Sequence, residues 1–147
     1  MHSHSEVVSI VNEVIETLNE RAEGYQRAAD HVKDPTIESI FREYAMQSKD
    51  FIAEMQSFSD STSEEIGKGP LGTIYQGWMN LKEKITGYNT KSILADCVLG
   101  EEAAIKVYQG AMKDEEVPAD LKNILSRQFT EISSAQDRIK SLQDQFN

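Results

Sequence analysis

Apolar residues recur at steps of three and four along every long segment of this 147-residue chain, and this spacing is the feature that most constrains its fold. The clearest line runs through residues 94–112 and comprises Leu94, Val98, Ile105, Tyr108 and Met112. Such spacing is typical of a helix that faces the core of a helical bundle. Glu101 falls on the same line, where the pattern requires an apolar residue. A carboxylate at such a position is either hydrogen-bonded within the core or part of a metal site.

The same spacing predicts five helices, over about residues 5–32, 35–58, 73–86, 90–113 and 118–145. Pro35 and Pro118 mark two of the boundaries, because proline suits the first turn of a helix and disfavours helix at the residue before it. Asp34 is a suitable cap for the second helix. No segment alternates apolar and polar residues with a period of two, so no strand is expected. The chain is therefore interpreted as a single all-α domain of residues 1–147.

The two halves of the chain resemble one another. Tyr25-Gln26 stands ten residues before Pro35, and Tyr108-Gln109 stands ten residues before Pro118. Two helical hairpins joined by one long connection form the ferritin-like, up-down arrangement of a four-helix bundle. The short helix at about 73–86 lies within that connection and is expected to pack, through Trp78 and its neighbours, across the end or side of the bundle.

A ferritin-type di-iron site requires a Glu from each of two helices and a Glu-x-x-His from each of the other two. When the two Tyr-Gln pairs are aligned, Leu18 occupies the place that corresponds to Glu101. The windows 48–51 and 133–136 on the second and last helices contain neither Glu nor His. Most of the ligand set is therefore missing, and a ferroxidase is not expected.

Glu101 remains the one candidate metal ligand, for iron or manganese, and we favour a structural role for it instead. In that role its carboxylate is held by tyrosine hydroxyls or by Gln128, or reaches solvent at a gap in the bundle. The sequence leaves these alternatives open.

Charge is expected at the surface and is strongly negative overall. In the first helix, five charged residues lie off the apolar line: Glu13, Glu16, Glu20, Arg21 and Arg27. The chain has 15 Lys and Arg against 25 Asp and Glu, which gives a net charge of −10 at pH 7. Phosphate backbones and anionic lipids repel such a chain, so neither a nucleic acid nor a membrane is expected as a partner.

The single cysteine, Cys97, leaves no pair for a disulfide and no thiolate metal site, and we interpret it as a small buried apolar residue. No apolar run reaches the roughly 18 to 20 residues that span a bilayer. The N-terminal residues lack the basic start and the apolar core of a signal peptide. The cytoplasm is therefore the expected location.

Four segments resemble a bacterial family of ferritin-like four-helix-bundle domains of unknown function. They are EGYQRAADHVKDP at 23–35, YQGWMNLKEKITG at 75–87, GEEAAIKVYQGAM at 100–112 and DRIKSLQD at 137–144. The resemblance implies a soluble bacterial protein remotely related to rubrerythrins and bacterioferritins, and it implies no activity. Of the metal ligands in those relatives, it carries over only Glu101 and, less closely, Glu23. We expect a non-enzymatic association module without a cofactor that forms a homo-oligomer. The alternative is an atypical or vestigial metal-binding protein that uses Glu101.

Overall fold

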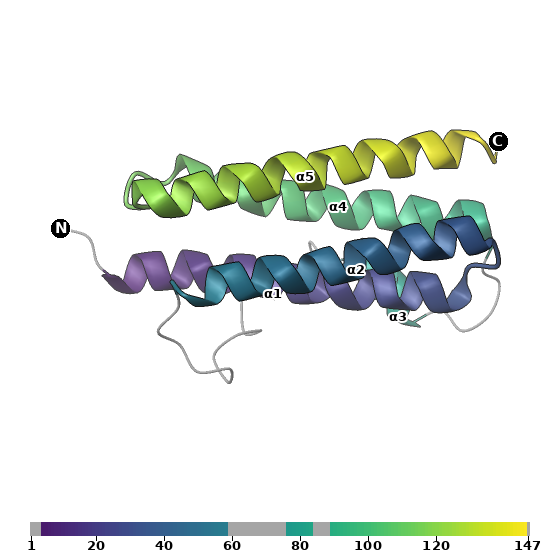
Figure 1. Ribbon diagram of the computed structural model, residues 1–147, viewed down its shortest axis with the longest axis horizontal. Coiled ribbons are helices and arrows are strands. Elements are labelled where there is room, and N and C mark those ends of the chain that lie inside the picture. The colour runs from purple at the N-terminus through teal and green to yellow at the C-terminus, as the bar shows by residue number, and fades with distance from the viewer. Residues whose placement is uncertain (1–3, 59–75, 84–88, 147) are drawn as a thin grey trace.

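The computed structural model describes residues 4–58, 76–83 and 89–146, and within them the chain is helical with no strand (Figure 1). The helices are α1 His4–His31, α2 Pro35–Gln56, α3 Gln76–Glu83, α4 Thr90–Lys113 and α5 Ala119–Asp144. All five expected helices are present, and the ends of the four long ones lie within two residues of the expected positions. The outer residues of the expected helix 73–86 lie outside the described part of the chain.

The four long helices form a bundle of two antiparallel hairpins, α1 with α2 and α4 with α5 (Figure 1). α2 ends at one end of the bundle and α4 begins at the other, so the connection between the hairpins joins opposite ends. The hairpins meet mainly where α1 packs on α4, and α3 lies against these same two helices. The backbones of α2 and α5 come close at few points, so the bundle is closed tightly on the α1–α4 side and more loosely, through side chains such as Arg127 and Glu54, on the α2–α5 side.

Helix caps explain two of the starts. Asp34 accepts hydrogen bonds from the backbone N–H groups of Thr36 and Ile37, with Pro35 at the first helical position of α2. Asn89 begins α4 through a reciprocal capping box with Ser92. Pro118 has an extended backbone with ψ 161° and is therefore the cap residue rather than the first helical one, so α5 begins one residue later than expected.

The core divides into two apolar clusters along the bundle. One contains Tyr25, Tyr44 and Cys97, and the other contains Leu18, Phe51 and Ala104. On each of α1, α2 and α4, a buried polar residue stands in sequence between the two clusters: Arg21, Ser48 and Glu101. A polar layer therefore crosses the bundle between two apolar halves.

The surface assignment for the charged residues of α1 was partly wrong. Arg21 is completely buried and Glu16 is 8% exposed, whereas Arg27 is exposed as expected. Cys97 is buried, as expected. No described helix has the length and apolar character that crossing a membrane requires.

Candidate functional site

The polar layer is built on an ion pair between Arg21 of α1 and Glu101 of α4. Arg21 Nε donates to Glu101 Oε1 at 2.7 Å, and Nη2 donates to Oε2 at 2.9 Å. Both side chains are fully shielded from solvent. This two-pronged geometry matches the fork of a guanidinium to the two oxygens of a carboxylate, and it is the strongest form of such a pair.

Two further side chains complete the layer. The Tyr25 hydroxyl donates to Glu101 Oε2 at 2.6 Å, and Arg21 Nη1 donates to the Ser48 hydroxyl oxygen at 2.9 Å. Ser48 in turn donates to the backbone carbonyl of Tyr44 at 2.9 Å. Each charged group is thereby hydrogen-bonded on more than one side, which is the condition under which buried charge is tolerated.

Two tyrosine rings enclose the guanidinium. The Arg21 guanidinium carbon lies 5.3 Å from the centre of the Tyr25 ring and 5.6 Å from that of Tyr44. Both distances are within the range at which an arginine is attracted to an aromatic ring. Tyr25 therefore contacts both members of the ion pair, through its ring and through its hydroxyl.

The protonation states of the layer follow from burial and from the ion pair. Burial by itself would lower the pKa of Arg21, but the charge and hydrogen bonds of Glu101 outweigh it and raise that pKa above its ordinary value. Burial, reinforced by the Glu101 charge, raises the pKa of Tyr25. Burial and the same charge also raise the pKa of Cys97, so its thiol is not an activated nucleophile. Arg21 stays a cation and Tyr25 stays a donor.

The structural role for Glu101 is the one that these contacts support. Of the partners weighed for it, a tyrosine hydroxyl is present, whereas Gln128 is engaged elsewhere: its Oε1 accepts from Tyr108 at 2.6 Å, and its Nε2 donates to Glu54 Oε1 at 2.9 Å. The main partner, Arg21, was missed. Its spacing was a usable signal: Arg21 was placed off the apolar line of α1, but it stands three residues after Leu18 and four before Tyr25, so the helical repeat also turns it toward the face that these two residues bury.

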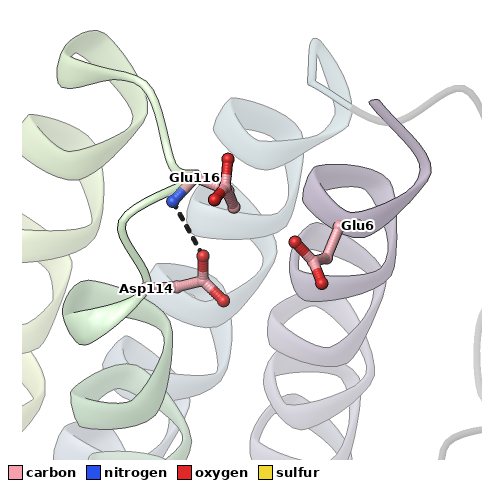
Figure 2. Close-up of side chains that lie close together, drawn as sticks. All are labelled: Glu6, Asp114 and Glu116. Atoms are coloured by element: carbon pink, nitrogen blue, oxygen red, sulfur yellow. Dashed lines mark hydrogen bonds between the residues drawn. The ribbon is translucent and has the colours of Figure 1, made fainter. Parts of the chain in front are cut away.

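Glu101 belongs to no group of potential metal ligands within the described residues, and Glu23 is exposed. The one group of three that these residues contain is Glu6, Asp114 and Glu116, whose oxygens lie within 4.8 Å of one another. Figure 2 shows Glu6 on α1 facing the turn between α4 and α5. Asp114 Oδ1 accepts from the Glu116 backbone N–H at 2.8 Å, so that carboxylate shapes the turn. Surface acids of this kind are common without a metal.

Next to the polar layer, α3 inserts Trp78 between α1 and α4. The indole is fully buried and its centre lies 5.1 Å from the Tyr25 ring. A Cβ atom on Gly24 would lie 2.3 Å from the indole, and one on Gly100 would lie 2.2 Å from it. Two glycines on facing helices thus create the space for Trp78, in agreement with the expected packing role of this residue.

Residues 6–114 match the model of a protein family described as a domain of unknown function, DUF2383. The chain belongs to the DUF2383 family. The match includes every residue of the polar layer, from Arg21 to Glu101, and ends at the turn before α5. No curated protein matches the chain. Membership in a family of unknown function agrees with the expectation from the sequence, and the kinship with rubrerythrins remains a prediction.

Proposed function

We propose that this DUF2383 protein is a ferritin-like bundle that acts by association with other proteins or with its own copies, and that it is not an enzyme. The observation that carries the proposal is the engagement of both Glu101 oxygens by Arg21. In a ferritin-like bundle this is where a carboxylate would hold a metal, and here a guanidinium supplies the positive charge.

The closed character of the polar layer supports a role without catalysis. Arg21, Ser48 and Glu101 are fully buried, and their side-chain hydrogen bonds are made to one another, to Tyr25 and to the backbone of Tyr44. A substrate or a metal ion would have to displace a buried guanidinium from a two-pronged pair, which costs several kcal/mol for each charge left unpaired. The polar layer is better suited to fixing how the two hairpins meet.

Metal analysis tests the proposal that Arg21, and not a metal ion, supplies the positive charge beside Glu101. The purified protein is incubated with ferrous iron or manganese, desalted, and analysed by inductively coupled plasma spectrometry beside Glu101→Ala and Arg21→Ala. We expect no metal above background in the wild type. Near-stoichiometric metal that disappears in Glu101→Ala would overturn the proposal in favour of an atypical metal-binding protein.

Light scattering coupled to size-exclusion chromatography tests association between copies. We propose a homo-oligomer in the cytoplasm, and a molar mass that is a multiple of the 16.6 kDa chain is the expected result. A monomeric mass at all concentrations would contradict self-association and leave a different protein as the partner.

A further inference from the structure

A groove runs along the loosely closed side of the bundle, between residues 43–54 of α2 and 127–131 of α5. It lies on the opposite side of the bundle from the tightly packed α1 and α4. We propose that this α2–α5 groove binds a cationic amphipathic helix of another protein. The inference rests on the proposed association function and names the surface and the chemistry of the partner.

Charge is the first argument. The groove is lined by four carboxylates, from Glu43, Asp50, Glu54 and Glu131, and by one guanidinium, from Arg127. Arg127 is already neutralised, because it pairs with Glu54 and lies 3.6 Å from Glu131. Glu43 and Asp50 are exposed and form no ion pair with another described residue, although the Arg138 charge acts on Glu43 from nearby. The groove therefore presents an excess of negative charge to a ligand.

The apolar part of the groove is the second argument. Met46 is 59% exposed, which makes it the most exposed large apolar side chain of the described residues. It lines the groove together with Phe51, and Met is a residue that adapts to varied apolar partners. A partner that brings an apolar side chain would cover Met46.

The dimensions favour a helix. Glu43, Gln47, Asp50 and Glu54 follow one another at steps of four, three and four, so they form one stripe along α2. At about 1.5 Å per residue the stripe is roughly 16 Å long, which corresponds to three turns of a ligand helix. Lysines or arginines on such a helix can pair with the acids while its apolar face covers Met46, in the manner of helix-in-groove recognition.

Other occupants fit less well. Two copies of this chain that met groove to groove would bring like charges together, so a homo-oligomer would use a different surface. Nucleic acids and anionic lipids are repelled for the same reason. A simple polyamine would meet the charge but would leave Met46 in water.

The test uses a synthetic Leu/Lys peptide of about 14 residues, with leucines at helical spacing on one face. Binding to the full chain in the presence of a chelator is measured by fluorescence anisotropy of the labelled peptide. A scrambled peptide of the same composition and spermine serve as competitors. We expect the patterned peptide to bind and both competitors to be at least about tenfold weaker, a difference of roughly 1.4 kcal/mol.

Variants locate the binding. Glu43→Lys/Asp50→Lys and Met46→Gln change exposed groove residues, and each is expected to weaken binding of the peptide by about tenfold or more. Glu115→Lys/Asp137→Lys makes the same change in net charge away from the groove and should alter affinity by less than about threefold. Equal losses in the groove and control variants, equal binding of the scrambled peptide, or no binding would each overturn the proposal. Metal uptake and oligomeric mass are measured separately, so the proposed function can stand or fall independently of the groove.

Discussion

Arg21 and Glu101, 80 positions apart in the sequence, form a fully buried ion pair through two hydrogen bonds and so connect one hairpin to the other. α1 and α4 are the helices through which the hairpins mainly meet. The pair therefore fixes the alignment of these helices at the level where the two apolar clusters of the core are divided.

Removing one member of the ion pair should be far more damaging than removing both. Arg21→Met or Glu101→Leu leaves the opposite charge buried and unpaired, and we expect each to lower the free energy of unfolding by about 3–5 kcal/mol. The double variant Arg21→Met/Glu101→Leu should be much more stable than the sum of the single losses implies. Urea denaturation of all four proteins measures the coupling. Additive losses would show that the pair does not act as a unit.

Ser48 should contribute through its hydrogen bond to Arg21. Ser48→Ala leaves Nη1 of a buried guanidinium without this acceptor, so we expect a loss of about 1–3 kcal/mol in the free energy of unfolding. Ser39→Ala, at an exposed position of the same helix, serves as the control and should change stability by less than about 0.5 kcal/mol. Comparable effects of the two substitutions would contradict the assigned contact.

The packing around Trp78 predicts that two glycine-to-alanine substitutions lower the stability of the protein, and a third glycine, away from Trp78, serves as a control that raises it. Gly24→Ala and Gly100→Ala force the indole to move, and we expect each to lower the free energy of unfolding by about 1–3 kcal/mol. Gly110 is exposed in α4 with nothing within 4 Å of an added Cβ, so Gly110→Ala should raise stability by about 0.5–1 kcal/mol. Trp78 is the only tryptophan, so its emission reports the displacement directly. Unchanged emission in both destabilised variants would argue against the packing of Trp78 on Gly24 and Gly100.

Alkaline pH should lower the free energy of unfolding because three buried groups keep their protons in the folded protein. The pKa values of Tyr25, Tyr108 and Cys97 are all raised, mainly by burial. Above the ordinary values of 9.0 for Cys and 10.0 for Tyr, the unfolded chain loses protons that the folded chain retains. Stability is therefore full below those values and falls as pH rises, by at most about 1.4 kcal/mol per pH unit for each group.

Urea denaturation at pH 8 to 11 measures this slope, with the single variants Tyr108→Phe and Cys97→Ala compared with the wild type. Each variant removes one titrating group and should flatten the decline. A decline that is unchanged in both variants would assign the alkaline loss to other groups.

The helices and the unusual position of Glu101 could be predicted from the sequence because both depend on spacing along a single helix. Arg21 illustrates the limit. Its helical spacing from Leu18 and Tyr25 is compatible with burial, but arginine is seldom fully buried without a partner, and that partner is distant in sequence. Gln128 was one of the partners weighed for Glu101, yet it accepts from Tyr108 instead, because spacing along one helix does not tell which residues of another helix stand at the same level. Nothing in the sequence around Gly24 and Gly100 indicates that these glycines accommodate Trp78, because the tryptophan lies on another helix.

The cation that faces Glu101 is part of the polypeptide, which has a consequence for how the protein reaches its working form. A bundle that closes around an imported ion has to be loaded after synthesis, and its folding depends on the supply of that ion. Arg21 is synthesised in the same chain as Glu101, so the cation and the carboxylate are always present in equal numbers. The ion pair at the centre of this bundle is thus formed as soon as α1 and α4 meet, and its formation does not depend on the supply of an ion.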